Sequence, residues 1–309
     1  MPSLMVYGYK GLGDNIYQRP FIRAAAERNK VFLRTPWPEI YSDLANVYFL
    51  KEKTTLRTQN KNMLRVPARM WAPPPSSCKA VKMGYAPKDL EQRSILSTFE
   101  RQLPLEGRPF RFDLPRYEWT PPTDRPYAVV RPVTLRKEWR SASRGPKQEY
   151  IQESINILKA HGYYVVSIAD VENDQEWFDE FEPTGIDAKY HRGELLTKSL
   201  MACIAEASVV VSGVCFVPIM ALAYSRPLFT IFGGRGAHNA PKVIFEDRMN
   251  LKASKLGTAI PDSYCMCAAA DHACNKHISN FAGQFSRWLE GLEQCNSSGM
   301  TTKGTAISR

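Results

Sequence analysis

The chain has 309 residues, of which 44% are hydrophobic, and it carries a net charge of +10. This length allows one large domain or two of ordinary size, and the hydrophobic fraction is ample for a core. No apolar run approaches the length of a membrane span, and no signal peptide is recognisable at the start, so we expect a cytoplasmic protein. The seven cysteines are odd in number and scattered, which excludes a secreted disulfide framework.

The positive charge is concentrated in the first part of the chain. Residues 1–122 contain 20 Lys/Arg and 11 Asp/Glu, whereas residues 123–309 contain 21 and 20. A surplus of this size in one region favours an anionic partner, such as nucleic acid, a phosphorylated glycolipid or a membrane surface. Solubility is the alternative explanation.

The first part of the chain alternates strands and helices. Strands are predicted at 4–9, 31–35 and near 50, with a helix at 15–28 and a second, proline-opened helix after residue 35. Residues 51–122 are less regular and rich in Lys, Arg and Pro, with one predicted helix at 86–103. The proline-rich segment 118–126 is typical of a linker, so we predict an N-terminal domain at 1–122.

The second part repeats the alternation. Strands are predicted at 127–133, 163–169, 208–213 and 227–234, and helices at 148–160, 194–207 and 217–225. We therefore predict a C-terminal domain at 123–295, with a last helix at 278–292 that could cross back to the first domain. The small, polar residues 296–309 are expected to be a disordered tail. The predicted fold class is α/β: two doubly wound, Rossmann-like domains facing a cleft, with ligands at the carboxyl ends of the strands.

The stretch GLGDNIYQRP follows the first strand. Its glycines lack the G-x-G-x-x-G spacing, and the second strand ends in Arg34 rather than an acidic residue, so a dinucleotide site is disfavoured. Asp14 has two compatible interpretations. It could cap the helix, or it could act as a general base at the cleft edge and take a proton from an acceptor hydroxyl. We assign Gly11, Gly13 and Asn15 to a thin loop that a bulky acceptor could approach.

These motifs resemble glycosyltransferase family nine, the ADP-heptose:lipopolysaccharide heptosyltransferases and their relatives. Gly11-Leu12-Gly13-Asp14, followed after five residues by Pro20 and then Ile22-Arg23, is similar to the opening motif of that family. Three further segments are similar in the same order: Arg131-Pro132 with the basic loop after it, VVSGVCFVPIMALAYSRPLFTIFGG, and CMCAAADHACNKHIS. The resemblance covers most of the chain except about 51–122.

The resemblance implies a GT-B fold and an inverting transfer of sugar from a nucleotide-sugar donor. It implies that Asp14 is the catalytic base, and that neither a cofactor nor a metal is required. The implied acceptor is a phosphorylated lipopolysaccharide core, with the enzyme peripheral to the membrane.

The basic region 51–122 also suits DNA or RNA carrying a hydroxylated base, as in viral DNA modification in a host cytoplasm, since phosphates dominate such binding. Aromatic residues lie among its basic ones, as a nucleic-acid surface would need. Both polyanionic acceptors remain open.

Within that resemblance, the leaving diphosphate requires positive charge. GT-B enzymes supply it with cationic side chains and helix N-termini. The basic loop 136–147 precedes a predicted helix, and Arg144 is its best single candidate. The predicted donor-binding residues are Arg131, Thr134, Arg136, Arg140, Arg144, Gly213, Gly233, Gly234 and Glu246.

The sequence departs from the family at one donor segment. The family's Asp-Thr-Gly turn is replaced by Val214-Cys215-Phe216, and its following histidine by Ile219. The donor is then held differently or is a different molecule. The alternative is a catalytically retired GT-B fold that binds nucleic acid or glycan.

One group of cysteines and histidines lies close together in the sequence. It comprises Cys265, Cys267, His272, Cys274 and His277. The C-x-C spacing is tighter than the usual C-x₂₋₄-C of zinc sites, and no second pair follows. The sequence therefore favours reduced cysteines, with Cys265, Cys267, Cys274 and His277 as a weak zinc candidate.

Overall fold

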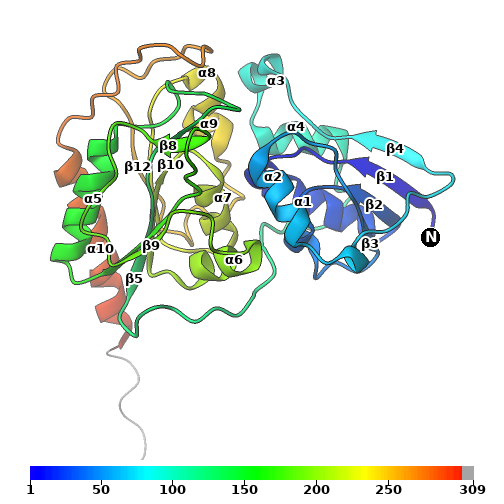
Figure 1. Cartoon of the computed structure of the whole chain (residues 1–309), viewed down its shortest axis with the longest axis horizontal. Helices are drawn as coiled ribbons and strands as arrows, with labels where there is room; N and C mark the ends of the chain where they lie inside the picture. Colours follow the sequence, from blue (N-terminus) through cyan, green and yellow to red (C-terminus); the bar gives the residue numbers. More distant parts are fainter. Residues whose placement is uncertain (301–309) are drawn as a thin grey trace, which may run out of the picture.

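The computed structural model describes the backbone of residues 1–300 and the side chains of residues 1–294. Two α/β units lie side by side, joined by a long irregular segment over 103–126 (Figure 1). The boundary proposed at residue 122 falls inside this segment. Each unit is built on a parallel sheet, so the predicted fold class of two doubly wound units is confirmed.

The N-terminal unit contains a four-stranded parallel sheet in the order β3-β2-β1-β4. Its strands are β1 (Ser3–Tyr7), β2 (Lys30–Arg34), β3 (Val47–Leu50) and β4 (Lys79–Lys82). Helix α1 (Leu12–Ala26) connects β1 to β2 and buries Ile16, Phe21 and Ile22 against the sheet. Such a crossover returns the chain to a parallel neighbour, which explains why β1 and β2 can pair along their whole length.

Shorter helices complete this unit: η1 (Pro38–Tyr41), α2 (Arg57–Arg65), η2 (Ala68–Met70), α3 (Pro87–Gln92) and α4 (Ile95–Gln102). The single helix predicted at 86–103 is in fact split into α3 and α4. Ser94 causes the break, because its Oγ accepts a hydrogen bond from the Ser97 amide at 3.0 Å and caps the start of α4.

The C-terminal unit contains a six-stranded parallel sheet in the order β12-β11-β10-β5-β7-β9. Its strands are β5 (Tyr127–Arg131), β7 (Tyr164–Ile168), β9 (Ala188–Tyr190), β10 (Val209–Gly213), β11 (Leu228–Ile231) and β12 (Gly257–Ala259). A separate antiparallel pair consists of β6 (Thr134–Arg136) and β8 (Glu176–Phe178). Strands β5 and β10 are buried on both faces, which explains their continuous apolar sequences.

Helices cover both faces of the second sheet. They are α5 (Gln148–Ala160), α6 (Thr197–Glu206), α7 (Phe216–Ala223), α8 (Gly236–Asn239), α9 (Pro241–Ile244) and α10 (Phe281–Met300). Helix α10 lies beside α5 and β12 (Figure 1), so the described part of the last helix does not cross back to the first unit. Residues 296–300 continue α10, and the rest of the predicted tail lies outside the described residues.

The two units share a continuous apolar interior. One core cluster runs from α1 and β1 in the first unit to α6 and α7 in the second. Helix α1 packs on α7, α3 on α8 and α4 on α9. Among polar contacts, the Tyr17 hydroxyl donates to the Ile244 carbonyl at 2.7 Å. These contacts fix the position of α1, and of the loop before it, relative to the second unit.

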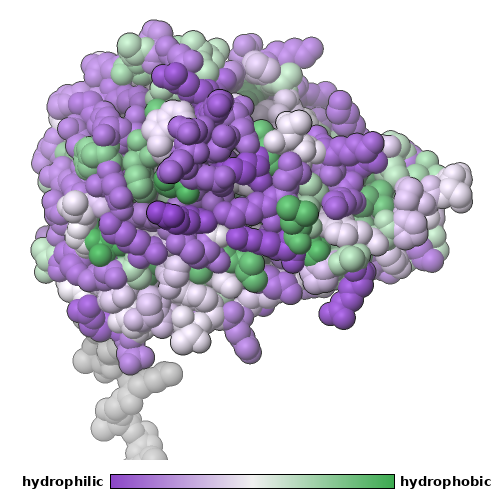
Figure 2. Space-filling view, viewed as in Figure 1, coloured by the Kyte–Doolittle hydropathy of each residue, from purple (hydrophilic) through white to green (hydrophobic). Residues whose placement is uncertain are grey.

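The face shown in Figure 2 is largely hydrophilic, and hydrophilic side chains cover much of the junction between the units. Within residues 1–300, no helix combines the length and the apolar character that crossing a membrane requires.

Candidate functional site

A cleft of about 920 Å³ lies between the two units. The last residues of several strands line it, namely Tyr7, Arg34 and Lys82 in the first unit and Arg131, Ile168 and Gly213 in the second. Ligands of doubly wound sheets bind at this end of the strands. The cleft is therefore the natural place to test the residues that the sequence singled out.

Asp14 lines the cleft near the start of α1. The helix begins at Leu12 with Gly11 as its N-cap, so Asp14 occupies the third helical position and is not the capping residue. The Gly11 amide donates a hydrogen bond to the Asp14 carboxylate, which is half of a capping box. A Cβ on Gly11 would overlap Asp14 Oδ2, so only glycine allows this close approach.

The environment of Asp14 makes it a better proton acceptor than an ordinary carboxylate. Burial raises its pKa to about 6, while a hydrogen bond from Tyr85, the charge of Arg144 and the Gly11 amide oppose the rise. The Tyr85 hydroxyl lies 2.8 Å from Asp14 Oδ1. A base with a pKa near 6 is mostly ionised at neutral pH and still binds a proton readily, as general base catalysis requires.

The other two residues of the predicted acceptor loop shape the backbone. A Cβ on Gly13 would lie 3.3 Å from the Phe216 Cα, so glycine allows the start of α1 to approach the start of α7. Asn15 is buried, and its side-chain amide donates to the carbonyls of Tyr9 and Gly11 at 2.8 and 2.7 Å. Gly13 lines the cleft, whereas Asn15 supports the loop from behind.

Arg144 lines the opposite wall of the cleft, in the loop between β6 and α5. Its guanidinium lies 5.4 Å from the centre of the Trp139 ring. Its Nε is buried and has no hydrogen-bond partner among the described residues. A buried donor without a partner is costly, so Arg144 can offer a hydrogen bond to an anion in the cleft.

Three other predicted donor residues meet at a carboxylate instead. The side chain of Glu176, in β8, is 1% exposed. Thr134 donates to it at 2.7 Å, and the guanidinium of Arg136 lies 2.9 Å away. Arg131 is 3.6 Å from the same carboxylate. These residues line the cleft, but Glu176 already neutralises much of their charge.

Sequence reasoning missed Glu176 and its partner from the first unit. Arg57, in α2, reaches Glu176 at 3.1 Å, Glu172 at 2.7 Å and Asp170 at 3.2 Å. This ion-pair network joins the two units along one side of the cleft. Nothing local marks Glu176, which lies in an acid-rich segment, and its partners are 40 or more positions away in the sequence.

The remaining predicted donor residues are placed as follows. Gly213 lines the cleft, but Arg140 is exposed, 3.6 Å from Asp271. Gly233 packs closely on the Gly145 backbone, and Gly234 on Cys274.

Glu246 lies outside the cleft lining. It accepts hydrogen bonds from Ser94 and Ser97 of α4, across the junction between the units. These contacts link the second unit to the first.

The segment that departs from the family pattern also lines the cleft. Cys215 caps α7, because its Sγ accepts a hydrogen bond from the Val217 amide at 3.4 Å. The Phe216 ring lies 5.2 Å from the Arg131 guanidinium. This part of the wall is therefore apolar and aromatic.

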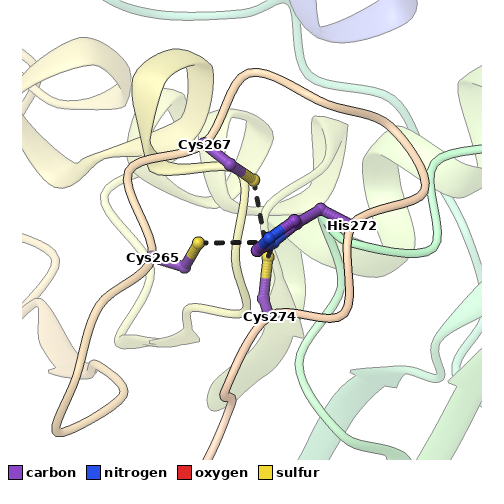
Figure 3. A group of neighbouring side chains, drawn as sticks. All are labelled: Cys265, Cys267, His272 and Cys274. Atoms are coloured by element: carbon purple, nitrogen blue, oxygen red, sulfur yellow. Dashed lines mark hydrogen bonds between the residues drawn. The ribbon is translucent and has the colours of Figure 1, made fainter.

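Four side chains of the cysteine- and histidine-rich loop gather at one point (Figure 3). They are Cys265, Cys267, His272 and Cys274, and their ligand atoms all lie within 4.8 Å of one another. The closest pairs are 3.3 to 3.5 Å apart. Ligands around a tetrahedral metal with 2.3 Å bonds to sulfur are about 3.8 Å apart, so this geometry and this donor set fit a thiolate-binding metal.

This loop also supports the loop that carries Arg144. The Ser143 hydroxyl donates to the carbonyls of Ala269 and Ala270 at 2.6 and 2.7 Å. The Gly234 amide donates to the Ser143 carbonyl at 2.8 Å, and Gly234 in turn touches Cys274. A metal here would therefore stiffen the support beneath Arg144.

Comparison with known proteins gives no match to any protein-family model or to any curated protein sequence. Solved structures do match. The iron-containing dodecameric glycosyltransferase TibC of enterotoxigenic E. coli H10407 is 15% identical with a TM-score of 0.59, over 97% of this chain and 77% of TibC. E. coli ADP-heptose lps heptosyltransferase II is 13% identical with a TM-score of 0.53, over 96% and 100%. E. coli heptosyltransferase WaaC with ADP is 14% identical with a TM-score of 0.54, over 94% and 100%.

These findings overturn the expectation that no metal is required. TibC is described as iron-containing, and the present chain places three thiols and an imidazole in metal-binding geometry. The set of candidate metal ligands named from the sequence, which included His277, also needs correction. His272 completes the group, whereas His277 is exposed and lies 3.9 Å from Asp262. The tight C-x-C spacing misled, because the loop folds back to bring Cys274 and His272 to the pair.

The likeness in structure extends over nearly the whole chain, although few residues are identical. At 94–97% of the chain, it spans both units. The chain therefore has the GT-B fold of the heptosyltransferases, as the resemblance of its motifs implied.

Proposed function

We propose that this protein is a glycosyltransferase that moves a sugar from a nucleotide-sugar donor to a hydroxyl group of an acceptor. The observation that carries the proposal is Asp14. Its carboxylate has a pKa of about 6 and lies in the cleft within the electrostatic influence of Arg144. A base on one wall and a cation with an unsatisfied hydrogen-bond donor on the other suit sugar transfer from a diphosphate.

In the proposed reaction, Asp14 accepts the proton of the acceptor hydroxyl. The acceptor oxygen forms a bond to the anomeric carbon of the sugar. The bond from that carbon to the diphosphate oxygen breaks, and its electron pair leaves with the nucleoside diphosphate. Attack from the side opposite the leaving group inverts the anomeric centre, in line with the family resemblance.

Arg144 is proposed to stabilise the leaving diphosphate. Its Nε lacks a partner, whereas Arg131 and Arg136 are already paired with Glu176. The negative charge that develops on the diphosphate is the charge that such a cation stabilises. WaaC was solved with ADP, and TibC with an ADP-heptose, which supports a nucleoside diphosphate sugar as donor.

The proposed acceptor is polyanionic and binds the basic first unit. The surplus of Lys/Arg in residues 1–122 supports this, and the similarity to a lipopolysaccharide heptosyltransferase favours a phosphorylated glycolipid. A protein acting on such a lipid would work in the cytoplasm at the membrane surface. Retention on duplex DNA but not on anionic glycolipid vesicles would redirect the proposal to nucleic acid.

We also propose that Cys265, Cys267, His272 and Cys274 hold a metal ion, with iron or zinc as the candidates. The similarity to iron-containing TibC supports iron. When bound, the metal would cross-link its loop and add stability, as structural metals do.

The test is a thermal-shift screen of nucleotide sugars, followed by transfer and hydrolysis assays. We expect at least one nucleotide sugar to raise the melting temperature and to turn over, and Asp14→Asn to bind it without turnover. Asp124→Asn, an exposed carboxylate in the connecting segment, is the control. If no nucleotide sugar binds, the proposal fails. If one binds but is not turned over, and Asp14→Asn changes nothing, the retired fold is the better explanation.

A further inference from the structure

Three side chains form a row across the carboxyl ends of neighbouring strands in the N-terminal sheet. Arg34, Tyr7 and Lys82 are the last residues of β2, β1 and β4, and they are paired in register across the three neighbouring strands. Paired residues of a sheet lie on the same face, and strands are about 4.8 Å apart, so the two cations flank Tyr7 with roughly 10 Å between their backbones. All three residues line the cleft.

Apart from Arg144, the other cations that line this cleft already have partners among the described residues. Lys10 lies 3.4 Å from Glu52, and Lys61 lies 2.8 Å from Asp170. Arg131 and Arg136 face Glu176, as described above. Arg65 donates to a backbone carbonyl at 3.0 Å. These side chains have internal partners and are poorly suited to recruit an anion.

Arg34 and Lys82 have no carboxylate partner among residues 1–294. The Arg34 guanidinium lies over the Tyr7 ring, 5.0 Å from its centre, and its Nε is buried without a hydrogen-bond partner. The ring restricts the guanidinium, so less freedom is lost when a ligand binds. Lys82 is exposed and adds a second positive charge. In this respect the pair resembles Arg144 on the opposite wall.

We propose that Arg34 and Lys82, on either side of Tyr7, form a subsite for an acidic group of the acceptor. The inference rests on the proposed function and deepens it, because it requires a carboxylate or phosphate on the acceptor close to the hydroxyl that reacts. A guanidinium can bind either group through two parallel hydrogen bonds, and the ammonium adds charge.

The placement assigns this subsite to the acceptor rather than to the donor. Tyr7 ends the strand that leads directly into the Asp14 loop, so the row and the base belong to the same wall. Arg144, the cation assigned to the donor diphosphate, comes from the other unit. Within residues 1–294, the cleft thus has a cationic position without a carboxylate partner on each wall.

The experiment measures anion binding while ADP occupies the donor site. With saturating ADP, glucose 6-phosphate, glucuronate and glucose are titrated into the full-length protein by calorimetry. We expect the two anionic sugars to bind and glucose not to bind. The ratio of the dissociation constants of glucose 6-phosphate and glucuronate tells whether phosphate or carboxylate is preferred. Arg34→Gln and Lys82→Gln should each weaken anion binding about tenfold, as expected for loss of one charged hydrogen bond.

Lys79→Gln is the matched control, because Lys79 is exposed at the other end of β4 and does not line the cleft. It should leave anion binding unchanged, and all three variants should keep the affinity of the wild type for ADP. The proposal is overturned if the wild type binds no anionic sugar beside ADP, or if Arg34→Gln and Lys82→Gln bind as well as Lys79→Gln. If the wild type itself neither binds ADP nor transfers sugar, that result would instead count against the proposed function.

Discussion

The two walls of the cleft carry similar residue types but use their charges differently. On the C-terminal wall, Arg131 and Arg136 surround the buried Glu176, whereas Arg144 has no carboxylate partner among the residues that the structure describes. On the N-terminal wall, Asp14 has no ion pair with a described residue, and its pKa is raised to about 6 by burial. The charges of the C-terminal wall are largely neutralised by Glu176, whereas the N-terminal wall retains a carboxylate without an ion-pair partner among the described residues.

This difference shows that the number of Lys and Arg residues in a run of sequence does not tell how many of them bind a ligand. The charge of an arginine next to a buried glutamate stabilises that glutamate first. The cations available to a ligand are those without an internal partner.

The largest expected effect is on the N-terminal wall. Asp14→Asn should reduce sugar transfer by about 10²- to 10⁴-fold, the usual contribution of a general base. Because folding raises the pKa of Asp14 from 3.8 to about 6, its ionised form destabilises the folded state, and stability falls as pH rises through that range. Asp14→Asn should therefore raise the melting temperature at pH 7 and not at pH 4. A variant that is less active and also less stable at pH 7 would indicate a structural role.

On the C-terminal wall, the largest effect should be on stability. Glu176→Gln leaves Arg57, Arg131 and Arg136 around a neutral group, and breaking a buried ion pair costs about 3–5 kcal/mol. Chemical denaturation would measure this loss. Glu172→Gln is the matched control, because Glu172 also pairs with Arg57 but its side chain is 54% exposed. It should cost about 1 kcal/mol or less. Equal losses would mean that burial of Glu176 does not matter.

The next prediction concerns ADP binding and compares Arg144 on the C-terminal wall with the exposed Arg140. Arg144→Gln should weaken ADP binding roughly 10- to 100-fold, since a hydrogen bond to a charged group contributes about 1.5–3 kcal/mol. Arg140→Gln should change it little, because Arg140 is exposed beside Asp271. Calorimetric titration of both variants with ADP would decide. If Arg140→Gln has the larger effect, the diphosphate lies outside the cleft.

The sequence was informative where local patterns determine structure. The buried strands β5 and β10 and the helix α5 were predicted well, because continuous apolar runs and a regular apolar face leave few alternatives. Strand β4 was missed. It is short and has a Lys at each end, so only its pairing with β1 reveals it.

The candidate site was only partly predictable for the same physical reason. Asp14 and Arg144 stand in recognisable motifs, and both line the cleft. Glu176 could not be found, since its importance arises from partners that only the fold assembles. The difference between Arg144 and Arg136 likewise depends on long-range contacts. Sequence patterns therefore indicated which charges are present, but not which are free.

Removing the metal should affect the C-terminal wall indirectly. Cys274→Ser should lose the metal, lower the melting temperature and weaken ADP binding, because the cysteine loop supports Ser143 and the adjoining Arg144. Elemental analysis would establish whether the wild type holds one iron or zinc ion per chain. Cys78→Ser, at a free cysteine far from this loop in the sequence, should change none of these quantities. A wild-type protein without bound metal after anaerobic purification would refute the site.

The smallest effect returns to Asp14. Tyr85 donates a hydrogen bond to its carboxylate at 2.8 Å, which favours the ionised form and lowers the pKa. Tyr85→Phe should therefore raise the pKa of Asp14 further. Because the base must be ionised, activity is lost as pH falls through that pKa, and the acid limb of the kcat/KM profile should move to higher pH. The variant should be most impaired near pH 6 and close to wild type at pH 8. Tyr48→Phe, on an exposed ring of β3, is the control. A uniform loss across the pH range would mean that Tyr85 only packs against Tyr9, and that the N-terminal wall does not tune its base.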